Sequence, residues 1–522
     1  MSTQTTPPAT PSVPIAERPG RTLTLAAVLL AVFVVPMSIS GTAVALPDIG
    51  AATQAELVPL QWVVNAFNVA FACFTLVWGS VADIIGRVKA FAAGAVIYAL
   101  ASLASATVSE VIWLDVARAL AGIGGAAIFS CGAAIISTVY DGPARAKAFA
   151  LFGTCAGIGV AIGPSLAGVL VQSVGWRSVF ALHAIALFLV LLAVPAMAKA
   201  MPAGGRSDAR FDVAGSALFV IAMVLLTTAI VQGSQWSWGS VGVLGLFAGA
   251  AIVLTIFTVV ENRRTHPMLD LSVLRNRRFV GLCLVPVAAS FGFVTMLTYL
   301  PSYLTAVTGR DAGAAGLMMV LLTAPVLICP MLAAKLVNGG VPALSLIYAS
   351  LACLLVGDIA LTLFDPDVAV AVVALPMIVT GAGMGLSAGL VDGKALELVD
   401  PAKAGMAAGF LNTLRLGSEA VAVAVYGSAL ATVLGTRISD GIAAHENAGD
   451  TDRVADLTAG GDIDGAVSAS GAADPAAFHS FLARSYDAAF HSVLWGLAAA
   501  CLALCVLVAV LLRSGSDRTA AS

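Results

Sequence analysis

Four ionisable residues lie inside apolar segments, where an ionised side chain is energetically unfavourable: Asp115, Arg118, Arg415 and Glu419. An Asp or Arg at the centre of a membrane helix costs about 2.5–3.5 kcal/mol to insert, so such residues commonly have a function. At Glu419, desolvation would favour the neutral acid, whereas Arg415, four positions away on the same helix face, would favour the carboxylate. We therefore predict that these four residues are candidates to carry protons. The alternative is that Asp115–Arg118 and Arg415–Glu419 are permanent structural pairs.

The segments that hold these residues have the composition of membrane helices. Hydrophobic residues make up 60% of the 522 residues and charged residues only 11%, whereas ordinary soluble proteins carry about 25% charge. Apolar stretches long enough for the ~30 Å hydrocarbon core recur fourteen times. We predict an all-α integral membrane protein with helices over residues 23–46, 57–80, 90–107, 111–138, 147–171, 178–198, 213–232, 241–260, 279–305, 315–336, 343–363, 368–391, 405–433 and 488–512.

The distribution of basic residues predicts which way the chain crosses the membrane. Alternate loops and tails contain 19 of the 26 Lys and Arg residues, and such loops face the cytoplasm in membrane proteins. Because the number of helices is even, both termini are predicted on the cytoplasmic side. The expected location is the plasma membrane, in a bacterium its cytoplasmic membrane.

Charged segments divide the predicted helices into groups of six, two and six. We expect a disordered cytoplasmic tail (1–21), an N-terminal six-helix bundle (22–199), a linker (200–278) whose two membrane helices cover about 213–260, a C-terminal six-helix bundle (279–512) and a cytoplasmic tail (513–522). Within the second bundle, the stretch of about 434–487 is rich in Ala, Gly and Asp. We predict that it is a partly ordered outer loop.

Two glycine-containing motifs could control how these helices approach one another. In the first, glycines permit a tight turn between two apolar runs, and charges could form a latch that depends on conformation; its residues are Gly79, Asp83, Gly86, Arg87 and Lys89. In the second, small residues allow close helix packing and a proline introduces a bend; its residues are Gly159, Gly163, Pro164 and Gly168. The alternatives are ordinary anchoring by positive charge for the first motif and generic helix packing for the second.

Together with Leu114-x-x-x-Arg118, these motifs resemble those of the major facilitator superfamily, specifically its fourteen-helix drug:proton antiporter branch. The resemblance implies two six-helix bundles with a two-helix linker hairpin, and export of drugs or hydrophobic small molecules by proton antiport with alternating access. That branch usually has an Asp at the position of Ser38, so coupling would depend on other residues. The alternatives are a narrow-specificity exporter of one metabolite or antibiotic, an uncoupled facilitator, and a nontransporting membrane receptor.

Polar and aromatic residues on the helices that line the cavity in this superfamily outline a substrate site. Such mixed surfaces suit moderately sized, partly apolar molecules. Hydrogen bonding between helices is the alternative explanation for each residue. The candidates are Ser38, Thr42, Gln61, Asn65, Asn68, Phe291, Thr295, Tyr299, Thr380 and Met384.

Several classes of function are not expected. All eight cysteines lie in apolar segments and lack the spacing of a zinc site, and the glycine-rich segment 389–395 lacks the Ser or Thr of a P-loop. We therefore predict no enzyme, no metal, no cofactor and no nucleic-acid partner. The expected partners are a small-molecule substrate, protons as the coupling ion and the lipid bilayer, with the protein a monomer.

Overall fold

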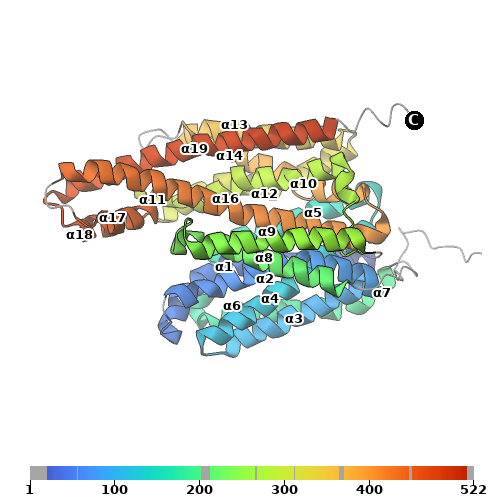
Figure 1. The fold of residues 1–522 in the computed structure, drawn as a ribbon. Helices are drawn as coiled ribbons and strands as arrows, with labels where there is room; N and C mark the ends of the chain where they lie inside the picture. The colour runs from blue at the N-terminus through green and yellow to red at the C-terminus, as the bar shows by residue number, and fades with distance from the viewer. Residues whose placement is uncertain are drawn as a thin grey trace, which may run out of the picture.

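The computed structural model describes residues 20–55, 57–201, 212–264, 267–310, 312–363, 370–445 and 449–513. These residues form two helical bundles that lie side by side, with a helical hairpin against them (Figure 1). The predicted tail residues 1–19 and 514–522 and the linker residues 202–211 lie outside the described ranges.

The first bundle contains α1 (Arg21–Thr53), α2 (Leu57–Ile85), α3 (Arg87–Thr107), α4 (Val111–Val139), α5 (Gly142–Val174), α6 (Arg177–Leu192) and α7 (Val194–Ala200). Glycines of α4 let its neighbours approach closely: a Cβ on Gly122 would lie 2.3 Å from the Phe67 carbonyl oxygen of α2, and one on Gly124 would lie 2.6 Å from the Gly94 carbonyl oxygen of α3. The backbones of α2 and α3 are therefore in direct contact with the backbone of α4.

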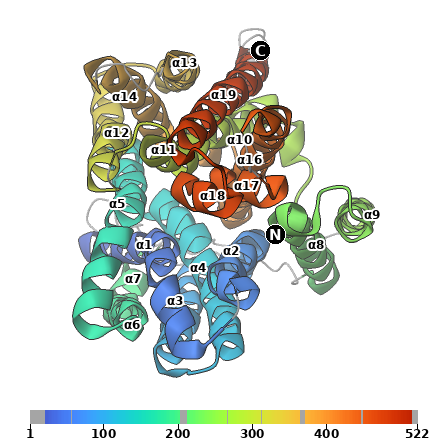
Figure 2. The same ribbon diagram turned by 90° about the vertical axis from the view of Figure 1, so that its left-hand side faces the viewer.

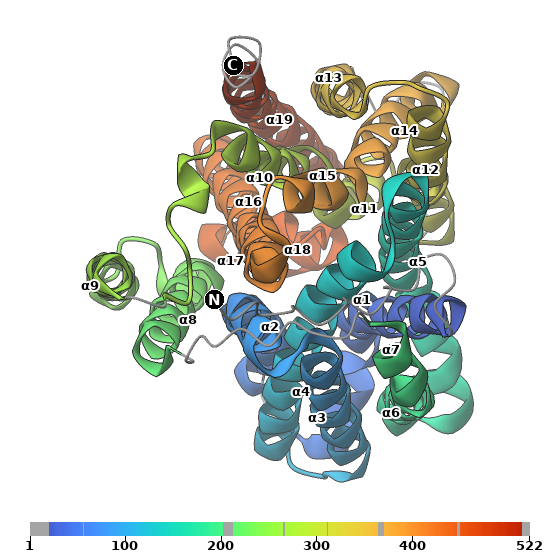
Figure 3. The ribbon, with the colours of Figure 1, turned by 90° about the vertical axis from the view of Figure 1, so that its right-hand side faces the viewer.

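The second bundle contains α10 (Arg277–Ala289), the π-helical segment η3 (Ser290–Val294), α11 (Thr295–Ala306), α12 (Ala312–Asn338), α13 (Ala343–Leu361), α14 (Val370–Ser387), α15 (Leu390–Glu397), α16 (Ala404–Gly441) and α19 (Pro475–Arg513). Between the bundles in sequence, α8 (Val213–Trp236) and α9 (Val241–Arg263) form the hairpin. The end-on views show α8 next to α2 and α16, with α9 on its outer side (Figures 2 and 3).

The predicted fold class is confirmed. Thirteen helices of the described residues are long and apolar enough to cross a membrane, and the pair α6–α7, bent by 44°, supplies the fourteenth span. The bend occurs where Pro195 opens α7 and cannot donate a backbone hydrogen bond. Each predicted apolar stretch corresponds to one of these spans.

The prediction of a partly ordered loop over about 434–487 is wrong. In the described part of this stretch, α16 continues to Gly441, α17 (Thr451–Ala459) and α18 (Ile463–Ser470) follow, and α19 begins at Pro475. Acidic residues that resemble loop residues cap these helices: Asp462 accepts a hydrogen bond from the Gly465 N–H at 2.8 Å. The few apolar residues, Val454 and Ile463 among them, are buried in the cluster that includes Phe478 of α19.

An ion pair connects the linker to the second bundle. Lys403, beside the start of α16, lies 2.5 Å from Asp270, which is in the segment between α9 and α10. Burial alone would raise the pKa of Asp270, but hydrogen bonds from Lys403 and Ser272 outweigh it and lower the pKa below its ordinary value.

We expect this pair to make a small, acid-sensitive contribution to stability. A carboxyl group whose pKa is lowered by folding stabilises the native state above its unfolded pKa, near 4, and that contribution is lost as the pH falls further. Because both side chains are partly exposed, Asp270→Asn should cost no more than about 1 kcal/mol at neutral pH. Thermal unfolding of the purified protein at neutral pH and below about pH 4 measures this. A loss in D270N that is as large in acid as at neutral pH would contradict it.

Candidate functional site

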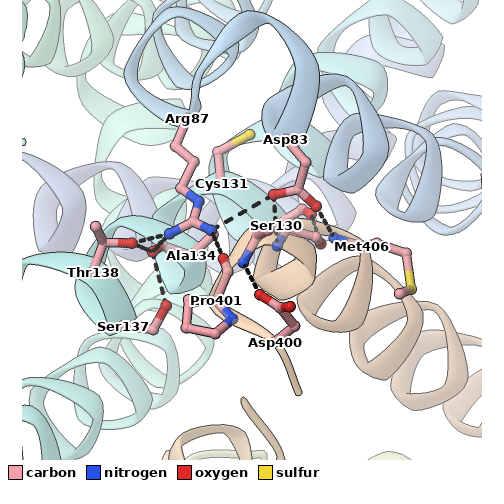
Figure 4. A network of polar contacts seen from close by, with 12 residues as sticks. Asp83, Arg87, Ser130, Cys131, Ala134, Ser137, Thr138, Asp400, Pro401 and Met406 are labelled. Atoms are coloured by element: carbon pink, nitrogen blue, oxygen red, sulfur yellow. Dashed lines mark hydrogen bonds and ion pairs between the residues drawn. The ribbon is translucent and has the colours of Figure 1, made fainter. Parts of the chain in front are cut away.

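The 79–89 motif joins the two bundles at one end of the molecule, here called the Gly86 end. Asp83 of α2 accepts hydrogen bonds from the backbone N–H groups of Gly405 at 3.1 Å and Met406 at 3.0 Å (Figure 4). These are free donors at the start of α16, where a carboxylate also interacts favourably with the helix dipole. One side chain of the first bundle therefore caps a helix of the second.

Arg87 extends the same contact. It lies 3.7 Å from Asp83 and donates to Thr138 of α4 and to the carbonyl oxygen of Pro401, which precedes α16 (Figure 4). Gly86 has φ +97°, in the left-handed region that favours glycine, so the turn places Arg87 two residues after the end of α2, as the first residue of α3. The last predicted member of the motif, Lys89, is exposed.

Two glycines allow α2 and α16 to touch at this end. A Cβ on Gly79 would lie 2.2 Å from the Gly405 carbonyl oxygen, and a Cβ on Gly405 would lie 2.5 Å from the Gly79 carbonyl oxygen. We call these glycines, with Asp83 and Met406, the α2–α16 latch. The latch requires glycine on both helices and holds the bundles together at the Gly86 end.

A cavity of about 310 Å³ lies between the bundles. Its first wall consists mainly of residues from α1 and α5, among them Ser40 and Phe152, with one phenylalanine each from α2 and α4. The second wall consists of residues from α10 to α16, among them Phe293 and Met384. Most lining residues are apolar, which suits a hydrophobic small molecule.

The charged residues of the cavity gather on its second wall. Arg415 donates to both carboxylate oxygens of Asp392, at 3.0 and 2.9 Å, and to Asn412 at 3.1 Å. Glu419 borders the same cavity one helical turn after Arg415. The described residues do not contain the alternative, a permanent Arg415–Glu419 ion pair: Arg415 pairs with Asp392, and Glu419 faces the cavity, where Arg415 still interacts with it electrostatically. The missed residue, Asp392, lies 23 positions before Arg415 on a different helix, so no helical periodicity connects the two.

Arg118 forms a separate site inside the first bundle. It is fully buried, donates to the Val63 carbonyl oxygen at 3.1 Å and to the Ser38 hydroxyl at 3.0 Å, and lies over the rings of Phe67 and Phe180. The predicted pairing with Asp115 is wrong. Among the described residues Asp115 has an oxygen without a hydrogen-bond partner, and no ion pair joins it to Arg118.

The second motif brings α5 against α1. A Cβ on Gly159 would lie 2.4 Å from the Phe33 carbonyl oxygen, and one on Gly163 would lie 2.1 Å from the Ser40 hydroxyl. Pro164 lies inside α5, and Gly168 has more room, with its nearest neighbour at 3.9 Å. The first two glycines therefore let α5 pack closely against α1, and Gly163 leaves room for Ser40, which borders the cavity.

The predicted substrate residues are mostly used for packing between helices in this conformation. Of the ten, Met384 borders the cavity. Tyr299 stacks on Tyr426 at 4.6 Å. Ser38, Thr42, Thr295 and Thr380 are fully buried, and Asn65, Asn68 and Phe291 are half-buried outside the cavity lining. The side chain of Gln61 lies outside the described residues.

The structure contains two bundles of membrane-spanning helices with a cavity between them. Together with the family to which the chain belongs, this identifies a multi-pass membrane transporter and not an enzyme. The chain belongs to the Major Facilitator Superfamily, whose family model matches residues 28–423. Within the described ranges, no group of three or more His, Cys, Asp or Glu residues could hold a metal ion.

Bacterial relatives match most of the chain. The multidrug resistance protein Stp of Mycobacterium tuberculosis is 30% identical over 417 residues, which cover 79% of this chain and 76% of that protein. A probable actinorhodin transporter of Streptomyces coelicolor is 31% identical and covers 76% of this chain and 70% of its own length. The apolar helices and these relatives place the chain in the cytoplasmic membrane.

Solved structures share the fold. The human organic anion transporter MFSD10 superposes with a TM-score of 0.57 at 14% identity, over 91% of this chain and 98% of that one.

Proposed function

We propose that this transporter exports drugs or other hydrophobic small molecules in exchange for protons. The observation that carries the proposal is the cavity between the bundles, which combines apolar walls with one carboxylate, Glu419, that is free of an ion pair among the described residues. A carboxylate in that position can bind either a proton or a positively charged substrate, and this competition is what antiport requires. The relatives named for multidrug resistance support export as the direction.

The contacts between the bundles support alternating access. The α2–α16 latch closes the Gly86 end, and Gly153 of α5 packs against Ala388 and Gly389 near the same end. Basic residues surround this end, so we assign it to the cytoplasmic side, together with both termini. Release of the latch would let the two bundles rock and open the cavity to the cytoplasm.

Everted membrane vesicles test the proposed function. In vesicles from a host that lacks its own efflux pumps, the wild-type chain should accumulate a hydrophobic, positively charged dye when the interior is acidified. An uncoupler that collapses the proton gradient should abolish this accumulation. Accumulation that survives the uncoupler would indicate a facilitator, and no accumulation of any drug tested would contradict multidrug export.

A narrow-specificity exporter is the second candidate, and one observation favours it. The relative from Streptomyces coelicolor is named for the transport of a single antibiotic. A resistance screen of a sensitive host that expresses the chain separates the two candidates. Protection against several unrelated compounds supports multidrug export, and protection against one compound supports the narrow exporter.

A further inference from the structure

A carboxylic acid with no described role lies deep in the second bundle. Asp358 of α13 has no exposed surface, and the weakly donating Cys501 thiol is the one hydrogen-bonding group that interacts with its carboxyl among the described residues. None of the ion pairs found in the described ranges includes it. It therefore differs from Asp83, Asp392 and Asp487, each of which has a charged or hydroxyl partner.

The groups around Asp358 cannot neutralise a negative charge. The π-helical segment η3 contributes Gly292, on which a Cβ would lie 2.8 Å from an Asp358 oxygen, and α19 contributes the thiols of Cys501 and Cys505. The helix α14, packed along α13, contains no titratable residue.

Two further helices that contact α13 have their titratable groups directed elsewhere. Asp392 of α15 is paired with Arg415, and Cys283 of α10 interacts electrostatically with that same pair. The other charged residues of α15, Lys394 and Glu397, pair with each other. The remaining basic residues of these elements lie away from Gly292 and Cys501, which mark the position of Asp358: Arg277 and Arg278 are in the first turn of α10, His479, Arg484 and His491 come at least ten residues before Cys501 in α19, and Arg513 ends that helix. No described cation forms an ion pair with Asp358.

The protonation state of this side chain follows from its surroundings. An ionised carboxylate without a partner in an apolar interior costs several kcal/mol, whereas the neutral acid costs far less. Ionisable residues inside membrane helices are rare, and they commonly mark ion or proton pathways. Asp358 is thus favoured as the neutral acid in this conformation.

Asp358 is separated from the substrate cavity by one short segment. On one side of η3, Gly292 contacts Asp358; on the other, Ser290, Phe293 and Val294 line the cavity. The Ser290 hydroxyl also lies 2.9 Å from that of Ser418, the residue before Glu419. Single turns of π-helix often occur at functional sites, and this one connects Asp358 with the cavity wall.

We propose that Asp358 is a proton-binding site that sets the position of the Ser290–Val294 segment, so that gain or loss of its proton changes the substrate cavity. The proton enters from water when the second bundle changes conformation and leaves to water by the same exchange. This proposal rests on the proposed proton antiport, and it adds a proton site outside the cavity to Glu419 within it.

Infrared difference spectroscopy of the full-length protein in lipid tests the site without relying on transport. A protonated carboxyl group has a C=O stretching band that an ionised one lacks. With Glu419 replaced by Gln, so that the cavity carboxyl cannot contribute, the protein should still show such a band, and Asp358→Asn in that background should remove it. Asp487→Asn is the matched control, because Asp487 accepts a hydrogen bond from Tyr303 at 2.6 Å and lies 3.4 Å from His491. D487N should leave the band in place, whereas a band that persists in D358N would overturn the proposal.

A second variant distinguishes loss of the proton-binding group from misfolding of D358N. Cys501→Ala removes the thiol beside Asp358 but keeps the acid, so it should shift the band without abolishing it. In everted vesicles, D358N should bind and exchange substrate but lose the stimulation by a proton gradient. Full stimulation in D358N would overturn the coupling role. If the wild type itself shows no stimulation, the proposed antiport fails, and the infrared band still decides whether Asp358 holds a proton.

Discussion

Asparagine in place of Asp392 is expected to destabilise the protein by up to about 3–5 kcal/mol, because it leaves the largely buried Arg415 guanidinium without its hydrogen-bonded counter-charge. The Asp392 side chain is only 3% exposed and binds Arg415 through both oxygens. Removing both charges should recover much of the loss, since a buried ion pair can be replaced by neutral groups at little cost. The double variant Asp392→Asn/Arg415→Gln should therefore be more stable than D392N alone.

Thermal unfolding of the purified variants in lipid nanodiscs measures this effect. Lys394→Ala is the matched control on the same short helix, because Lys394 pairs with Glu397 at 2.8 Å in an exposed position. Exposed pairs contribute about 0–1 kcal/mol, so K394A should be close to the wild type. A D392N variant as stable as K394A would show that the Arg415–Asp392 pair does not hold α15 to α16.

The second large effect is steric and concerns the α2–α16 latch. Gly405→Ala places a Cβ 2.5 Å from the Gly79 carbonyl oxygen and 2.7 Å from an Asp83 oxygen, distances at which something must move. We expect the bundles to separate at the Gly86 end and transport to fall at least about tenfold, a shift of roughly 1.4 kcal/mol between the two conformations. Gly435→Ala on the same helix is the control, because a Cβ there meets nothing within 4 Å.

Distances between spin labels measure this separation of the bundles directly. Labels at Ala144 of α5 and Glu397 of α15, both exposed and on opposite bundles, report the separation at the Gly86 end. G405A should shift the distribution to longer distances, and G435A should match the wild type. An unchanged distribution in G405A together with lost transport would mean that the glycine acts through something other than closure.

The number and approximate positions of the spans could be predicted because the length of an apolar run and the thickness of the hydrocarbon core decide them. Their ends could not, since α16 and α19 continue well past the apolar runs. The 79–89 motif could also be located, since its charges lie at the end of a span. Its partner could not, because the Gly405 and Met406 N–H groups that Asp83 caps are more than 320 residues away in sequence. Contacts of this kind depend on how the two bundles pack against each other, which the local sequence does not show.

Periodicity was least informative about the cavity. Helical spacing shows which residues share a face, but it does not show how each helix is rotated within its bundle. Ser38 and Ser40 illustrate the difference: Ser38 turns inward and accepts from Arg118, whereas Ser40, two positions later, borders the cavity. The short helices α17 and α18 were missed for another reason, because their apolar residues are few and their acidic caps resemble a loop.

The proposed antiport requires that a proton and a substrate compete for Glu419 in the cavity. Glu419→Gln keeps the shape and hydrogen-bonding capacity of the side chain but cannot exchange a proton at this site. In proteoliposomes with an imposed pH gradient, uphill transport by E419Q should fall to the level seen without a gradient, while exchange of labelled for unlabelled substrate continues. Uphill transport by E419Q with the same dependence on the pH gradient as the wild type would contradict the claim.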